Sequence, residues 1–263
     1  MIIVPKYIDS EAKLIIKKTN GSLYTLPTGW AIDDAGAYDF NNKLSERAFA
    51  HGSDMVGDAK VKGRTITIEF DMDGAIQNDH DNMVNLAYDA FVNVAELGQE
   101  NSTKKYKVAG LSKIKHKFHK GFKQRRSNIV VSLLLADPFR YAATETTISQ
   151  RYNSEQTATI ITFNNASSVD VPLIIRFTPT VEMPSVRIKH IESDRFFLMT
   201  DALLLNPKIA IVNGELGTVR RDNDNSINTF SGVFLTAYAG QNNYEYTGKA
   251  GLVEIIYTPR WFI

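Results

Sequence analysis

Histidines at a metal-ligand spacing are the first candidates for chemistry in this chain. His116 and His119 stand three residues apart within residues 113–120, a spacing that can pair two zinc ligands on a helix. The alternating apolar residues predict a strand here instead, and residues three apart on a strand face opposite sides. The flanking lysines would also repel a cation. We therefore predict that this segment holds no metal.

An acidic loop, residues 222–226, is similar to the start of a calcium-binding loop. An EF-hand loop that begins at Asp222 needs Gly at position 227 and Glu at position 233, where this chain has Ile227 and Val233. The Asp and Asn content predicts a solvated β-turn. A calcium site of another type stays open as an alternative.

Motifs for nucleophilic catalysis and nucleotide binding are missing from the sequence. It contains no Gly-x-Ser-x-Gly, no Gly-x-x-x-x-Gly-Lys and no Gly-x-Gly-x-x-Gly. The absence of cysteine removes disulfides, thiolate zinc sites and cysteine nucleophiles together. The acidic pairs Asp33/Asp34 and Asp71/Asp73 stand beside turn residues, and we interpret them as solvated loop residues. We expect a protein that is not an enzyme and that needs no cofactor.

Charge is distributed unevenly along the chain. Residues 101–136 contain no Asp or Glu and carry ten basic residues, although the net charge of the whole chain is only +1. The remaining residues therefore sum to −9, which is +1 minus +10. The ten basic residues are Lys104, Lys105, Lys107, Lys113, Lys115, Lys117, Lys120, Lys123, Arg125 and Arg126.

Three interpretations of this basic segment stay open. Lysines on an edge strand deter unwanted strand pairing, which needs no partner at all. Ten cations without an acid exceed that need, and they favour recognition of an acidic partner, including an acidic face on a neighbouring copy. Nucleic acid is the weaker candidate, because Tyr106, Phe118 and Phe122 interleave with the cations as stacking residues do, but such residues more often face inward from strands.

Composition and hydrophobic runs set the general class of protein. The 263 residues are 43% apolar and 22% charged, which suits about two domains with buried cores. The apolar run at the N-terminus is four residues long, too short for a signal peptide, and the run at residues 129–136 is too short to cross a bilayer. We expect a soluble protein, made in the cytoplasm, with no membrane insertion.

One helix is predicted over residues 79–97. Its apolar residues recur at steps of three and four and form one stripe, which must pack against a sheet. Asn78 or Asp79 suits the N-cap, and Gly98 suits a left-handed C-cap. The stripe consists of Met83, Leu86, Ala87, Ala90, Phe91, Val94 and Leu97.

Strands and turns account for almost everything else. Period-two alternation, or a short apolar run, predicts strands at residues 65–70, 114–118, 129–135, 157–163, 171–177, 185–191, 195–199, 202–205, 208–212, 233–238 and 252–257. The run at 129–135 predicts a strand buried on both faces. Turn residues punctuate the second half at 164–165, 206–207, 213–214, 240–243 and 247–248.

The predicted architecture is mostly β. We expect an N-terminal α+β domain over residues 1–145, a sandwich or barrel-like sheet with one helix, and an all-β domain over residues 155–263. The boundary is predicted within residues 141–156, which are polar and rich in Thr and Ser.

A buried strand that ends in Asp137-Pro138-Phe139-Arg-Tyr141 resembles the distal tail protein family of long-tailed bacteriophages. Gly63-Arg64 and the strand that follows them are similar to an early strand of that family, and the helix follows in the same order. Residues 162–165 and 171–175 resemble the opening of the family's C-terminal galectin-like jelly-roll sandwich, and residues 240–243 and 257–263 resemble its closing hairpin.

This resemblance implies a structural role in the virion, at the distal end of the tail. Members of the family form a homo-hexameric ring through their N-terminal domains, and the ring joins the tail-tube protein to the tail-tip hub protein. The C-terminal domains carry receptor-binding or accessory proteins, and DNA passes through the axial channel without specific binding. A carbohydrate-binding β-sandwich adhesion module is the alternative. It lacks support from a central Trp, because Trp261 is the only Trp in the second half.

Overall fold

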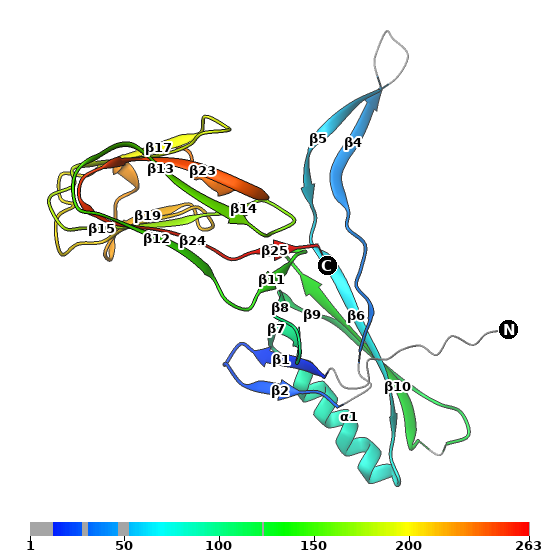
Figure 1. The fold of residues 1–263 in the computed structure, drawn as a ribbon. Coiled ribbons are helices and arrows are strands. Elements are labelled where there is room, and N and C mark those ends of the chain that lie inside the picture. Colours follow the sequence, from blue (N-terminus) through cyan, green and yellow to red (C-terminus); the bar gives the residue numbers. More distant parts are fainter. Residues whose placement is uncertain (1–12, 28–30, 47–52, 123, 263) are drawn as a thin grey trace. The chain divides into compact units, whose positions relative to one another are not determined.

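The computed structural model describes residues 13–27, 31–46, 53–122 and 124–262 (Figure 1). The chain divides into two compact units, Met1–Tyr141 and Ala142–Ile263, and each has a hydrophobic core of its own. No helix in these described ranges is long and apolar enough to span a membrane. The strand-rich fold confirms the mostly-β prediction.

In the described ranges, the first unit contains two sheets, one helix and a separate two-stranded hairpin. The first sheet has the order β2-β1-β7-β8-β11, and the second has the order β3-β6-β10-β9. The first sheet contains β1 (Leu14–Lys18), β2 (Leu23–Thr25), β7 (Val94–Gln99), β8 (Lys104–Lys107) and β11 (Arg140–Ala142). The second sheet and the hairpin contain β3 (Ala31–Asp34), β6 (Arg64–Asp73), β9 (Gly110–Phe118), β10 (Arg126–Leu135), and β4 (Phe40–Glu46) with β5 (Ser53–Val61).

Strict alternation of side chains gives the β3-β6-β10-β9 sheet one buried and one solvated face. Strands β6 and β10 pair along their whole length, from Asp73 opposite Arg126 to Arg64 opposite Leu135. Every second residue of each strand enters the core, as the period of a strand requires. The expectation that residues 129–135 are buried on both faces is wrong, because Leu134 is 43% exposed and only the alternate residues are fully buried.

Helix α1 (Gln77–Phe91) packs its buried residues against the core of the first unit. The Phe91 ring lies 6.2 Å from the Phe70 ring on β6, which confirms that the helix covers a sheet. The predicted start is wrong in detail: Ile76 is the N-cap and has no side-chain cap, while Asp79 lies in the first turn, where its charge suits the helix dipole. Leu86, predicted in the buried stripe, is 53% exposed.

The predicted helix runs six residues too far. The chain leaves the helix at Val92, and Asn93 adopts a positive φ of 59°. Val94 and Leu97 belong to β7, where Leu97 pairs with Ile16 of β1, and Gly98 is a strand residue rather than a C-cap. The spacing of these residues fits both a helix and a buried strand, so the apolar pattern does not mark the junction.

The second unit is a β-sandwich. One sheet has the order β12-β24-β15-β18-β19-β20, and the other has the order β13-β23-β16-β17-β21. The first sheet contains β12 (Thr146–Tyr152), β24 (Gly251–Tyr257), β15 (Ile174–Pro179), β18 (Ala210–Asn213), β19 (Thr218–Arg221) and β20 (Asp224–Asn225). The second contains β13 (Gln156–Asn165), β23 (Gly240–Gly248), β16 (Ser185–His190), β17 (Phe196–Thr200) and β21 (Phe230–Gly232). The short elements are β14 (Val171–Pro172), β22 (Thr236–Ala237), β25 (Arg260–Trp261) and the 3-10 helix η1 (Ile227–Thr229).

One core lies between the two sheets of the second unit. It joins Phe177 of one sheet to Phe197 of the other, with ring centroids 6.2 Å apart. Stacked aromatic pairs extend the core along both sheets, including Tyr152 with Tyr246 at 4.8 Å. Burial on one side of each strand explains why the alternating pattern located most of these strands.

Several strand predictions in the second unit are wrong in detail. Residues 202–205 form no strand, because a turn at Asp201–Leu204 turns Leu204 alone into the core. Residues 171–177 split into β14 and β15, and only Thr236–Ala237 of residues 233–238 is a strand. The predicted turn at 240–243 begins β23, and β23 and β24 lie in different sheets, so they form no closing hairpin.

Strand β12 lies inside the interval that was predicted as a boundary. It pairs with β24 from Thr146 opposite Tyr257 to Tyr152 opposite Gly251. β12 is at the edge of its sheet and most of its side chains are exposed, which explains its polar sequence.

Candidate assembly surface

Nine of the ten basic residues predicted at an interface lie in the described part of the first unit, on strands of two different sheets and in the turn between β9 and β10. Lys104, Lys105 and Lys107 lie on β8, and Lys113, Lys115 and Lys117 lie on β9. Lys120 and Arg125 lie in the turn between β9 and β10, and Arg126 begins β10. Lys123 lies outside the described residues.

Three lysines on β9 form a single exposed column. Lys113, Lys115 and Lys117 alternate with the half-buried Ile114 and His116, so all three side chains stand on the outer face. In the described part of the chain, none of the three has an ion-pair partner. β9 is also the edge strand of its sheet, which is the position where lysines deter stray pairing. The column therefore fits both edge protection and recognition of an acidic surface.

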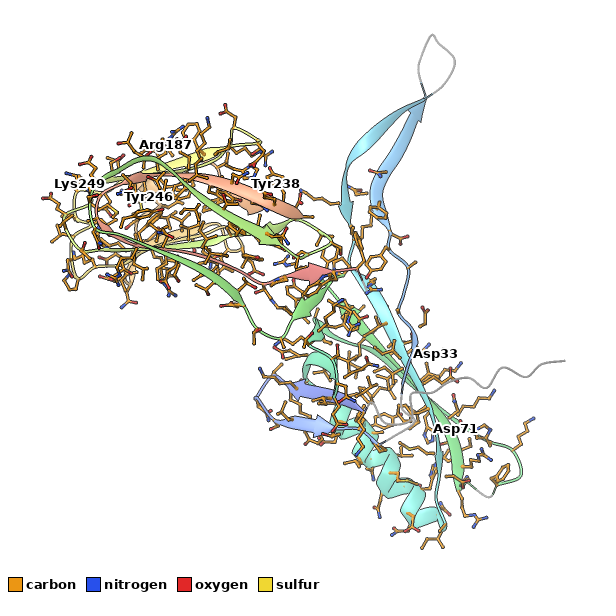
Figure 2. The ribbon with its side chains drawn as sticks, viewed as in Figure 1. Asp33, Asp71, Arg187, Tyr238, Tyr246 and Lys249 are labelled. Carbon is orange, nitrogen blue, oxygen red and sulfur yellow. The ribbon has the colours of Figure 1, made fainter. Side chains whose placement is uncertain are left out.

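An acidic column stands on the same face, two strands away. Glu69, Asp71 and Asp73 are the exposed, alternate residues of β6. The register places Asp71 opposite Asn128 of β10, and Asn128 opposite Lys117 of β9. The interpretation of Asp71 and Asp73 as loop residues is wrong, because both stand within β6. Figure 2 labels Asp71 on β6 and Asp33 on the neighbouring β3.

Hydrogen bonds stabilise the charged form of Asp71, the central residue of the acidic column. The Asn128 amide donates to Glu69 Oε1 at 2.9 Å and to Asp71 Oδ1 at 3.1 Å. The bond from Asn128 and a second contact from His119 Nε2 at 3.2 Å hold the pKa of Asp71 below its usual value. The face therefore keeps a negative column on β6 and a positive column on β9, with β10 between them.

Other members of the basic segment are engaged within the unit. Lys105 Nζ lies 3.0 Å from Glu96 Oε2, and Lys107 Nζ stands 4.0 Å over the Tyr141 ring. Arg125 donates to the Ala75 carbonyl at 2.7 Å. Lys105, Lys107 and Arg125 therefore make contacts within the first unit, whereas the lysines of the β9 column do not pair with a carboxylate in the described part of the chain.

Arg126 is engaged in the same way. Its guanidinium is 4.0 Å from Asp71 Oδ2 and 5.3 Å from the Phe122 ring centroid.

The aromatic residues considered for nucleic-acid stacking do not form a single surface, because Tyr106 is 6% exposed whereas Phe118 and Phe122 are 44% and 42% exposed.

The structure brings together the residues that carried the family resemblance. Arg64, which begins β6, is 7% exposed and donates from Nε to the Pro138 carbonyl at 3.0 Å. Asp137 accepts from the Phe139 amide at 3.1 Å and from the Tyr141 hydroxyl. Residues 74 positions apart therefore form one connected cluster at the end of the β6–β10 pair.

Gly63 and Gly36 allow backbone segments to approach each other closely at this cluster. A Cβ at Gly63 would lie 2.8 Å from the Leu135 carbonyl oxygen. Gly36 has a φ of +74°, and its carbonyl accepts from Arg64 Nη1 at 3.3 Å. The Ala35 carbonyl accepts from the same nitrogen. Backbone carbonyls thus satisfy much of the Arg64 guanidinium.

Arg140 is a residue of this region that the sequence did not single out. It occupies the variable position of the Asp-Pro-Phe-x-Tyr motif, and its guanidinium lies 5.3 Å from the Tyr106 ring centroid. Its Nη2 donates to Ser102 Oγ at 3.1 Å. The available signal was a cation beside a recognised motif, which composition alone does not distinguish from a surface arginine.

The described histidines of the first unit form no metal-like cluster, and His51 lies outside the described residues. His80 is fully buried, with Nε2 2.7 Å from Ser127 Oγ and Nδ1 3.4 Å from Asp81 Oδ1. Ser127 has no exposed surface, which leaves no room for a substrate beside this serine. The His116 ring stacks 5.8 Å from His80. In the ranges that the structure describes, no three His, Cys, Asp or Glu residues group to hold a metal.

Within the acidic segment at residues 222–226, residues 222–223 form the turn between β19 and β20, and Asp224 and Asn225 form β20 itself. Asp222 accepts from the Ile209 amide at 2.9 Å, and Asp224 lies 3.4 Å from Arg221. Arg221 also pairs with the buried Asp201 through Oδ1 and Oδ2, both at 2.7 Å. These carboxylates therefore close turns and pair with an arginine, in agreement with the predicted β-turn.

Trp261 and His190 of the second unit bear on the carbohydrate-binding alternative, and both side chains make contacts within the unit. The indole of Trp261 donates to the Ala166 carbonyl at 3.1 Å, a structural use of its polar edge. His190 is 3% exposed and lies between the rings of Tyr238 and Tyr244, at 4.8 and 4.9 Å. The carbohydrate-binding alternative stays a prediction.

Comparisons with known proteins give a match in structure alone. No protein-family model matches the chain, and no curated protein matches it by sequence. The crystal structure of the Dit protein (gp 19.1) of phage SPP1, described as a paradigm of hub adsorption apparatus in phages that infect Gram-positive hosts, aligns with a TM-score of 0.69. This alignment has 11% sequence identity and covers 95% of this chain and 98% of that one.

A second match is a chain from the phage P2 baseplate in its activated conformation with calcium. It has a TM-score of 0.48 and 8% identity, and covers 94% of this chain and 98% of that one. The agreement with the SPP1 protein extends through both units and confirms, at the level of fold, the resemblance indicated by Arg64 and residues 137–141. The chain therefore has the fold of a phage distal tail protein.

Proposed function

We propose that this chain is a structural protein of a phage or prophage tail tip. The observation that carries the proposal is the likeness to SPP1 Dit across 95% of the chain. In this proposal, residues 1–145 form a homo-hexameric ring that joins the tail-tube protein to the tail-tip hub protein. Residues 155–263 form a galectin-like domain that carries receptor-binding or accessory proteins. DNA crosses the ring without specific binding, and the protein is located in the virion.

The charge columns supply a physical means of assembly. A ring uses heterologous contacts, in which two different surfaces of the same chain meet. The lysine column on β9 and the carboxylate column on β6 are two such surfaces of opposite sign on every copy. Complementary charge steers copies together and disfavours contacts between like faces. We therefore propose that the β9 column meets an acidic surface of a neighbouring copy.

Mass measurement of the full chain tests the ring. Six copies of the 29.4 kDa chain have a mass of about 176 kDa, given a closed cyclic assembly. Light scattering after size exclusion, at low salt and across micromolar concentrations, should give this mass, and electron microscopy should show rings. A chain that stays monomeric, alone and when mixed with the tube and hub proteins encoded beside it, would contradict the ring.

Charge reversal tests the role of the β9 column. The triple variant Lys113→Glu, Lys115→Glu and Lys117→Glu should remain folded by circular dichroism and should fail to assemble. The matched control reverses three exposed arginines of the second unit, Arg151→Glu, Arg195→Glu and Arg220→Glu, with the same change in net charge. Assembly of the lysine variant to the same extent as the control would exclude the column from the interface.

Neutral substitution separates assembly from edge protection. If the lysines only protect the β9 edge, replacing all three by Thr should cause aggregation through strand pairing. If they bind an acidic surface, the Thr variant should be soluble and should assemble more weakly than the wild type. Turbidity and light scattering on the same samples distinguish these two results.

A further inference from the structure

A small cavity in the first unit has one cationic wall. It measures about 230 Å³ and lies between the end of β3 and strands β7, β8 and β11. Ile32 and Leu97 give it an apolar lining, while the Tyr106 ring and the Arg140 guanidinium give it a polar one. Its volume suits a short side chain or a small organic acid rather than a large ligand.

Arg140 lines this cavity, and its hydrogen-bonding capacity is not fully used within the chain. Its Nη2 is bonded to neutral acceptors, Ser102 Oγ at 3.1 Å and the Lys104 carbonyl at 3.4 Å. Its Nε is buried and has no acceptor. No carboxylate in the described ranges pairs with Arg140, so its charge is compensated only by carbonyl and hydroxyl oxygens and by the Tyr106 ring.

Arg64 adds a second guanidinium beside the same tyrosine, again without a carboxylate partner among the described residues. It lies 5.6 Å from the Tyr106 ring centroid and 4.0 Å from that of Tyr38. Its side chain donates to the backbone carbonyls of Pro138, Ala35 and Gly36, and its Nη2 is buried without an acceptor. Ala35 also lines the cavity. One buried and one half-buried guanidinium thus share one aromatic neighbour, with no carboxylate partner among the described residues.

We propose that this cavity binds a carboxylate group. A guanidinium presents paired N–H donors in a plane that matches the two oxygens of a carboxylate, and a charge-assisted pair gains most where both groups leave water. Arg140 is the direct partner, and Arg64 raises the positive potential. Ile32 and Leu97 accommodate the methylene groups that carry the carboxylate. The carboxylate comes either from a free small acid or from a glutamate side chain of a second copy.

Titration of the full chain with glutarate tests the site, and glutaramide, its neutral counterpart, serves as the control ligand. At matched ionic strength, glutarate should shift the arginine Nε–Hε resonance of Arg140 in a saturable way, with a dissociation constant on the order of millimolar. Glutaramide should produce no saturable shift. An equal response to both ligands, or a linear response to glutarate, would overturn the proposal without the need for any variant.

Variants test whether glutarate binds at the cavity. Binding to each variant is monitored through the backbone amide chemical shifts of the cavity residues. Arg140→Gln should weaken glutarate binding by about tenfold or more, and Arg140→Lys, which keeps the charge and loses the planar fork, should fall between it and the wild type. Arg151→Gln removes an exposed arginine of the second unit and should change nothing. Undiminished binding to a folded Arg140→Gln variant would remove Arg140 from the site.

Sedimentation velocity distinguishes the two sources. If a second copy supplies the carboxylate, saturating glutarate should dissociate the assembly and glutaramide should not. If the ligand is a free acid, glutarate should bind while the assembly stays unchanged. The site does not depend on the proposed ring: saturable glutarate binding to a chain that stays monomeric supports the cavity and contradicts the ring.

Discussion

Phe91 anchors the end of helix α1 in the core of the first unit. Its side chain has no exposed surface and stacks on Phe70. Phe91→Ala should lower the free energy of unfolding of this unit by about 3–5 kcal/mol, because the lost burial is joined by the cost of a cavity. Tyr88→Ala, on the exposed side of the same helix, should change it by about 0.5 kcal/mol or less. Urea denaturation followed by circular dichroism makes the comparison.

His190 gives the second unit a stability that depends on pH. Burial lowers the pKa of His190 below its ordinary value of 6.5, although Glu192, with Oε2 3.0 Å from Nε2, and Asn242 partly oppose the shift. Below pH 6.5 the unfolded chain therefore binds more protons than the folded chain at this residue. This contribution to stability is present above that pH and is lost as the pH falls toward the lowered pKa.

The His190→Gln variant isolates this contribution. Its melting temperature should fall less than that of the wild type between about pH 7.5 and about pH 5.5, whatever packing it loses at both pH values. The hydrogen bond from Asn243 holds the pKa of Glu192 below its usual value, so Glu192 keeps its charge through this interval. Equal pH slopes for the two proteins would exclude His190 as the source.

At the scale of elements, the turn after β3 depends on a glycine. Gly36 has a positive φ, and a Cβ there would stand 2.2 Å from the Thr65 carbonyl oxygen on β6. Gly21 also has a positive φ, but a Cβ there would meet nothing within 4 Å. Gly36→Ala should therefore cost more than Gly21→Ala by about 1–3 kcal/mol, since backbone displacement adds to the strain. Thermal unfolding of both variants measures the difference, and equal costs would contradict it.

Alternation located strands well where one face is buried, as in β6 and β10, because the period of two is imposed by the core. It failed where that constraint is weak. The polar sequence of the edge strand β12 predicts a domain boundary instead of a strand. The apolar spacing of Val94 and Leu97 continues that of the helix, so the sequence predicts helix where β7 lies. Contacts between β1 and β7, rather than local preference, decide that junction.

At the scale of the molecule, the two hydrophobic cores share no residue. We therefore expect two calorimetric transitions, because each unit buries its own apolar surface. Phe91→Ala should lower the temperature of one transition, and Phe197→Ala in the other core should lower only the second. A single transition that both variants shift equally would show that the units unfold together.

The sequence could locate the basic segment but could not divide its members by role. Lys105 and Lys113 are equivalent in composition, yet Lys105 pairs with Glu96 while Lys113 stands in the column on β9. The contact of Arg140 with Tyr106 could not be predicted from the sequence, because it depends on the position of β11 beside β8. Such roles depend on contacts between residues distant in the chain, which no local spacing encodes.

The repeat of the two columns limits what charge alone can specify. The lysines of β9 and the carboxylates of β6 each recur at every second residue, a spacing of about 6.8 Å along a strand. If the two columns are displaced by one repeat of two residues, most of their opposite charges still face each other. Attraction between them can therefore bring copies together quickly and hold them at the wrong offset, so a unique alignment must come from a feature that occurs once per copy.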